Sequence, residues 1–205
     1  MPRPPLLAPL ALLAAAPFLL AACGGDDSSQ DEDDITAAIE RAATTDDAAN
    51  CTDVQTAAFT EQIEFTQGEE AIAACEESAG NGEVAGESVE VSSIEVDGDS
   101  ATAEVAFTGG GLNGQTAAIS LVKEDDLWKL DSLDEFTSFD KEAFTAGLLE
   151  AAGEDGELPQ EAADCLTQAI ESTPDEELQT IYLSGDEEQL VGLFGEDTEV
   201  GPTVE

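Results

Sequence analysis

Between residues 87 and 135 apolar and polar residues alternate along the chain, and this pattern constrains the fold more than any other feature of the sequence. Alternation with a period of two predicts strands with one buried face. The phase changes between Val91 and Ile94, which predicts a β-bulge at Ser92-Ser93. Asp97-Gly98 is typical of a two-residue hairpin turn. Further alternating runs follow at residues 101–107, 117–121 and 127–133, so the sequence predicts an antiparallel meander.

Apolar residues recur at helical spacing on both sides of this meander, over residues 35–79 and 137–195. Helices followed by an antiparallel sheet predict an α+β domain whose bent sheet curls around the helices. Thr52 with Gln55 suggests a capping box that opens the second helix, with Val54, Ala58 and Phe59 facing inward. A third helix is expected from about Glu69 to Ser78. In the second half, Thr173-Pro174-Asp175-Glu176 predicts a helix start, and Ser184 with Glu187 suggests another. Residues 196–205 are expected to form a disordered tail.

Residues 1–22 have the layout of a secretory signal, because Arg3 precedes an apolar run that ends in small residues. Pro9 and Pro17 interrupt this run and disfavour a stable membrane span. Leu20-Ala21-Ala22-Cys23 resembles the lipobox of bacterial lipoproteins. The resemblance implies cleavage between Ala22 and Cys23, lipid on Cys23, and a position on the extracytoplasmic face of the cell membrane. The alternative is an uncleaved apolar anchor with Cys23 as a bystander.

Acidic residues outnumber basic ones by 48 to five, which gives a net charge of -43. Nucleic acid is excluded as a partner, because phosphate binding needs a basic surface. Anionic headgroups are repelled too, so lipid rather than charge would hold the protein at a membrane. Three explanations of the acidic composition stay open: a solvated surface, adaptation to a saline medium, or loose capture of divalent cations. Residues 23–34 carry six acids and no apolar residue after Cys23, which predicts a flexible tether.

The segments VEVSSIEVDGDSATAEVAF and GQTAAISLVKEDDLWKLDSL, preceded by helices, are similar to the NTF2-like fold, which includes SnoaL-like and ketosteroid-isomerase-like proteins. The likeness is closest to small domains of actinobacterial lipoproteins, whose last hairpin often has a charged turn followed by Trp-Lys-apolar, as at Leu121 to Leu130. The resemblance covers residues 35–136. It implies a cone of helices on a curved sheet, followed here by a small helical segment at residues 137–195.

The available side chains argue against catalysis. The chain has no histidine, and Tyr182, its one tyrosine, lies outside the region that resembles the family. Arg41, the one arginine after the signal, has no recognisable partners. We therefore expect a non-catalytic binding or structural module of the cell envelope, without a cofactor, whose partner is a small apolar ligand or an envelope protein. The alternative is an exported NTF2-like enzyme of the isomerase, dehydratase or hydrolase type that uses a buried carboxylate. An open pocket holding a buried Asp or Glu with a strongly shifted pKa would favour the enzyme, whereas a filled cone would favour the module.

Three aromatic or aliphatic residues, Phe107, Ile119 and Trp128, are candidates to line a pocket, although core packing is the favoured interpretation of each. No metal site is expected, because neither Asp97-Gly98-Asp99 nor Glu124-Asp125-Asp126 continues as a calcium loop and both suit hairpin turns.

Cysteine placement is informative in an exported chain, since the setting is oxidising. Cys51 and Cys75 are expected to form a disulfide between two antiparallel helices, and the alternative is a pair of buried thiols. Cys165 is expected to be buried as a small apolar residue. A bridge from Cys165 to another molecule, or to Cys51 or Cys75, stays open.

Overall fold

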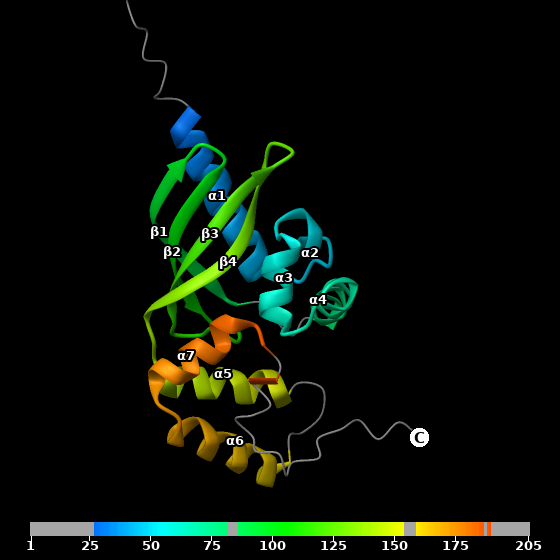
Figure 1. The fold of residues 1–205 in the computed structure, drawn as a ribbon, viewed down its shortest axis with the longest axis vertical. Helices are drawn as coiled ribbons and strands as arrows, with labels where there is room; N and C mark the ends of the chain where they lie inside the picture. The colour runs from blue at the N-terminus through cyan, green and yellow to red at the C-terminus, as the bar shows by residue number, and fades with distance from the viewer. Residues whose placement is uncertain (1–26, 82–85, 154–158, 187, 190–205) are drawn as a thin grey trace, which may run out of the picture.

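The computed structural model describes residues 27–81, 86–153, 159–186 and 188–189. Within these residues, four helices precede a four-stranded sheet and three helices follow it (Figure 1). The helices before the sheet are α1 (Asp27–Thr44), α2 (Asn50–Asp53), α3 (Ala57–Glu64) and α4 (Glu69–Asn81). The strands are β1 (Ser88–Asp97), β2 (Ser100–Thr108), β3 (Thr116–Glu124) and β4 (Leu127–Ser138). The last helices are α5 (Lys141–Gly153), α6 (Gln160–Ser172) and α7 (Asp175–Ser184). The prediction of an α+β fold is confirmed.

The sheet is an antiparallel meander in the order β1-β2-β3-β4. The predicted bulge is confirmed, because the register of β1 and β2 shifts between Ser92 and Glu95 and Ser93 has a positive φ of 52°. The first hairpin lies one residue later than predicted: Asp97 pairs with Ser100, so Gly98 and Asp99 form the turn. Gly98 takes a φ of 65° there, which costs glycine little. The bulge bends the strand, so the sheet presents a concave face.

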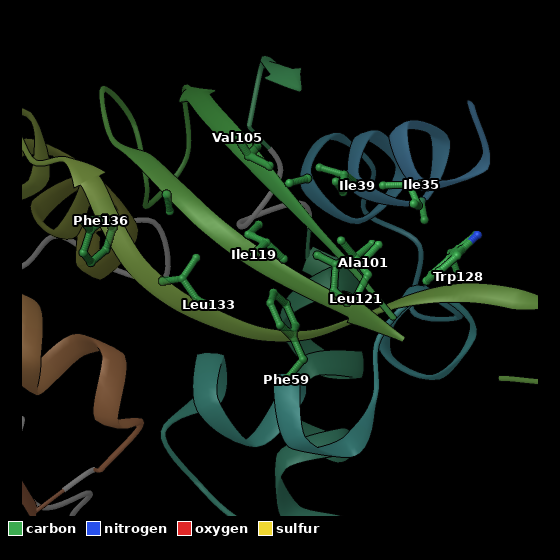
Figure 2. Close-up of a cluster of buried hydrophobic side chains, with 14 residues drawn as sticks. Ile35, Ile39, Phe59, Ala101, Val105, Ile119, Leu121, Trp128, Leu133 and Phe136 are labelled. Carbon is green, nitrogen blue, oxygen red and sulfur yellow. The ribbon is translucent and has the colours of Figure 1, made fainter. Parts of the chain in front are cut away.

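Helix α1 crosses this face, and the hydrophobic core lies between them (Figure 2). Ile35 and Ile39 of α1 are fully buried there against strand residues that include Val105, Ile119 and Leu121. Their spacing of four places both isoleucines on one side of the helix. Phe59 of α3 joins the same cluster.

The expected flexible tether is wrong for residues 27–34, because α1 begins at Asp27. The Asp31 carboxylate accepts hydrogen bonds from Lys123 Nζ at 2.7 Å and from Trp128 Nε1 at 3.0 Å. These bonds join the start of α1 to the β3–β4 hairpin and order a segment that has no apolar residues of its own. Acidic residues near the positive end of the helix dipole also favour the helix. Residues 23–26 lie outside the described residues.

The capping box expected at Thr52 is also wrong. Thr52 lies inside the short helix α2, and Thr56 is the residue that caps α3, where its hydroxyl accepts a hydrogen bond from the Phe59 amide at 3.2 Å. The backbone between the two helices is held extended, because Leu130 of β4 accepts a bond from the Thr56 amide and donates one to Val54. This contact with the sheet moves the helix start by four residues. Val54 and Phe59 are buried as expected, whereas Ala58 is exposed.

Two buried or partly buried glutamines attach the C-terminal helices to the sheet. The Gln115 side chain donates to the Asp140 carbonyl oxygen at 3.0 Å and accepts from the Asp140 amide at 2.8 Å, just before α5. The Gln62 side chain bonds both the amide and the carbonyl oxygen of Leu133 and also the carbonyl oxygen of Leu183, each at 2.8 Å. Helix α7 is thereby fixed beside α3 and β4.

Helix α7 begins at Asp175, within the predicted helix start at Thr173-Pro174-Asp175-Glu176. Pro174 precedes the helix without a side-chain cap, because the Thr173 hydroxyl donates to the Ala169 carbonyl oxygen of α6. Ser184 ends α7 rather than opening another helix, and Glu187 and residues 190–195 lie outside the described residues.

Within the part of the chain that the structure describes, no helix has the length and apolar character that a membrane span requires. The apolar leader at residues 1–22 and the expected tail at residues 196–205 lie outside that part.

Candidate functional site

A cavity of about 160 Å³ lies between the concave face of the sheet and the helices that cover it. Phe107 and Ile119 line it, as do apolar side chains from α1 and α3, including Ile39, Ala42, Phe59 and Ile63. An apolar protein cavity of about 150 Å³ is large enough to hold benzene. Trp128, the third pocket candidate, does not line this cavity: it is 3% exposed and its indole nitrogen bonds Asp31 near the start of α1.

Asn50, the first residue of α2, is one of the residues that line this cavity, and its side chain contains a buried polar atom without a partner in the described part of the chain. Its side-chain nitrogen donates to the carbonyl oxygens of Arg41 and Thr45, both at 3.2 Å, and to Thr45 Oγ1 at 2.8 Å. Because two of these partners are acceptors only, the nitrogen must face them and Oδ1 must face the other way. Asn50 is 4% exposed, and its Oδ1 has no hydrogen-bond partner among the described residues. A buried acceptor without a partner costs about 1–3 kcal/mol.

Glu64, the last residue of α3, brings a carboxylate to the same cavity. The side chain is partly buried, and this burial raises its pKa above the ordinary value of 4.5. The next residue, Phe65, takes a left-handed φ of 53° and packs edge-on against Tyr182, with ring centroids 5.4 Å apart. A left-handed bulky residue is uncommon, and the aromatic contact holds it in place.

Tyr182 reaches the cavity from α7, far along the sequence from the other lining residues. Its ring also contacts Phe136 and Phe144, at centroid distances of 5.7 and 5.5 Å. Burial, assisted by the negative charge of Glu64, raises the pKa of Tyr182 to about 12. The phenol is therefore neutral at physiological pH and can donate or accept a hydrogen bond.

The charge around the cavity is negative. Asp46 and Asp47, which are exposed, line it together with Glu64, and none of the lining residues that the structure describes is basic. Arg41 lies nearby, and its guanidinium pairs with Asp53 at 3.3 Å and with Asp47 at 3.9 Å. Arg41 thus has acidic partners that the sequence did not reveal.

The disulfide between Cys51 and Cys75 is confirmed, and both residues form part of the cavity wall. It joins α2 to α4 across a Cα–Cα distance of 6.0 Å and so holds Asn50 beside the cavity. Cys165 is an exposed free thiol, so its expected burial is wrong. Its helix, α6, packs mainly against α5, which leaves much of its surface uncovered.

Both acidic tripeptides lie at hairpin turns, as expected. Gly98-Asp99 and Asp125-Asp126 are the turns of the two outer hairpins. Across the described ranges, no three Cys, Asp or Glu side chains gather closely enough to hold a metal ion.

Sequence reasoning missed Asn50, Glu64 and Tyr182. Asn50 follows a segment that only interrupts a helical pattern, and Glu64 is one acid among 48. Tyr182 was set aside because it lies outside the expected domain, yet α7 packs back onto β4. No local signal distinguishes these residues, since folding across long sequence separations brings them together.

A scan against protein-family models found no match for the chain, and neither did searches of curated proteins and of solved structures.

Proposed function

We propose that this chain is an extracytoplasmic lipoprotein, held on the cell membrane by lipid on Cys23, whose NTF2-like domain is a non-catalytic module that binds a small apolar ligand. The lipobox-like motif supports the anchor. The order of helices and meander, and the cavity between them, support the family. The C-terminal helices add Tyr182 to the cavity wall and so complete the binding domain.

The observation that carries the binding proposal is the cavity of about 160 Å³, whose mainly apolar walls also include Glu64 and Tyr182. Small-molecule sites typically combine apolar walls with a few placed polar groups. A fully packed core would leave no such space.

The anchor is tested by replacing Cys23 with serine in the full chain expressed in its bacterial host. We expect Cys23→Ser to leave the membrane fraction or to remain unprocessed, because serine cannot carry the thioether-linked lipid. Mass spectrometry of the wild-type mature terminus should find an acylated cysteine. A wild-type terminus elsewhere, without an acyl mass, contradicts the anchor.

The cavity is tested by titrating the protein with toluene and with benzyl alcohol and monitoring binding by NMR. Ala42 lines the cavity, whereas Ala37 is exposed on the same helix. Leucine at position 42 adds three carbons that occupy the cavity, so Ala42→Leu should abolish binding while Ala37→Leu preserves it. Binding that survives Ala42→Leu, or no binding of either probe to the wild type, contradicts the proposal.

A second candidate function, proton abstraction by an enzyme, is favoured by the presence of Glu64 and Tyr182 on one cavity. A carboxylate with a raised pKa can remove a proton next to a ketone, and a neutral phenol can donate a hydrogen bond to the enolate oxygen. The test is exchange of the α-protons of cyclohexanone in deuterated water. Exchange that is faster than in buffer and is lost in Glu64→Gln supports the enzyme, whereas a rate equal to that in buffer favours the binding module.

A further inference from the structure

We infer that the cavity selects a small apolar amine, in its ammonium form, over neutral and anionic molecules of the same shape. This inference rests on the proposed binding function and names the chemical class of the ligand.

The first step is the hydrogen-bond character of Glu64, whose partly buried side chain lines the cavity. An ionised carboxylate can only accept hydrogen bonds, so a ligand that pairs with it must bring a donor. An ammonium group offers three donors, whereas a carboxylate offers none and would place a second acceptor against the first.

The second step is charge. The carboxylates of Glu64, Asp46 and Asp47 surround the same space, with no basic side chain among the described lining residues. Arg41, which does not line the cavity, pairs with Asp47 at 3.9 Å and offsets part of its charge, whereas Gln55 and Tyr182 are neutral. A cation is therefore stabilised in the cavity and an anion is repelled.

The third step concerns the walls. Phe59, Phe107 and Tyr182 supply aromatic rings to the lining, and the faces of such rings attract cations. At about 160 Å³ the space suits a ligand of roughly benzene size with a short polar substituent. Apolar and aromatic walls together with a partly buried carboxylate match an arylalkyl or alkyl amine.

The inference is tested with three probes of one shape: benzylamine, benzyl alcohol and benzoate. Dissociation constants are measured at pH 7 on the full chain in 1 M NaCl, where the screening length falls to about 3 Å and general attraction of cations to the acidic surface is suppressed. Benzylamine should bind about tenfold more tightly than benzyl alcohol, because hydrogen bonds to charged groups are roughly twice as strong as neutral ones. Benzoate should bind least.

Two variants localise the effect. Glu64→Gln keeps the shape of the side chain and removes its charge, so it should bring benzylamine close to benzyl alcohol in affinity. Glu40→Gln removes an exposed acid of α1 that does not line the cavity, and it should leave the preference unchanged.

The outcomes separate this inference from the function on which it rests. If no probe binds, or if binding survives Ala42→Leu, the proposed binding function fails. If benzyl alcohol binds in the cavity as tightly as benzylamine, or if benzoate binds more tightly, the function stands and the preference for amines is overturned. A preference for benzylamine that persists in Glu64→Gln overturns the role assigned to that carboxylate.

Discussion

Asp31 shows how one side chain can order a segment that composition alone would leave flexible. Its carboxylate bonds Lys123 and Trp128, and the Lys123 ammonium also lies 5.3 Å from the centre of the Trp128 ring. The hydrogen bond from Lys123, followed by that from Trp128, lowers the pKa of Asp31 below its ordinary value of 3.8. The hydrogen bond to Asp31 correspondingly raises the pKa of Lys123.

We expect Asp31→Asn to destabilise the protein at pH 7, measured by denaturant unfolding. A lowered pKa means that the unfolded state binds protons more readily, so the stabilisation is fully present above pH 3.8 and is lost as the pH falls through the lowered value. The difference in free energy of unfolding between wild type and Asp31→Asn should therefore disappear at acidic pH. Asp33→Asn, at an exposed position of the same helix, is the control. An equal loss of stability in Asp31→Asn and Asp33→Asn would argue against a specific role for Asp31.

Glu64 is expected to behave in the opposite way. Burial raises its pKa, so the ionised carboxylate is less favourable in the folded than in the unfolded state. Glu64→Gln should therefore be more stable than wild type above the raised pKa, and this advantage should disappear below pH 4.5, where the acid is protonated in both states. Thermal unfolding between pH 4 and 8 tests this, with Glu40→Gln as the matched variant. An advantage that does not change with pH would contradict it.

Individual site residues could be predicted only where a strong chemical rule applied. Cys51 and Cys75 were paired correctly, because export and antiparallel helices favour a disulfide. The roles of Asn50 and Tyr182 depend on contacts with distant parts of the chain, which no local pattern records.

Helix α7 depends on Gln62 for its attachment to the domain. The Gln62 amide bonds α7 and β4 together, and Gly185, in a left-handed conformation with φ of 60°, packs where a Cβ would lie 2.7 Å from the Gln62 Cα. The close approach explains why glycine follows α7.

Replacing Gln62 with leucine should loosen this attachment. The change removes three hydrogen bonds and leaves backbone groups of Leu133 and Leu183 without that partner, so a loss of about 2 kcal/mol or more is expected. The pKa of Tyr182, about 12 in the wild type, should fall toward 10 as its hydroxyl regains water. Because Tyr182 is the one tyrosine in the chain, its ultraviolet absorbance reports the titration directly. Gln67→Leu, at an exposed position before α4, is the control, and an unchanged Tyr182 titration in Gln62→Leu would contradict the expected role of Gln62.

The sheet was more predictable than the helix boundaries. Its strands, the bulge at Ser93 and the meander follow from alternation, since a half-buried strand repeats every two residues. Helix starts failed where contacts with the sheet outweighed local signals: Asp31 extends α1 backwards, and Leu130 delays α3.

The protein as a whole carries far more acid than base, with a net charge of -43. Mutual repulsion opposes compaction, and salt screens it. We therefore expect the unfolding temperature to rise steadily between low salt and 1 M NaCl. Unfolding is monitored by the fluorescence of the one tryptophan. A flat profile would contradict self-repulsion. A response that saturates at millimolar calcium, but not at matched ionic strength of NaCl, would instead indicate capture of divalent cations.

The early start of α1 determines how the molecule would stand on a bilayer. Four peptide units separate Cys23 from Asp27, so the linker between a lipidated Cys23 and the start of α1 would span at most about 14 Å. The β1–β2 and β3–β4 hairpins lie at this end, whereas the β2–β3 loop, whose Gly109 and Leu112 line the cavity, lies at the other (Figure 1). With such a short linker, the tips of the two hairpins would face the lipid and the cavity would face the aqueous medium. Ligands would then enter from the medium and not from the membrane.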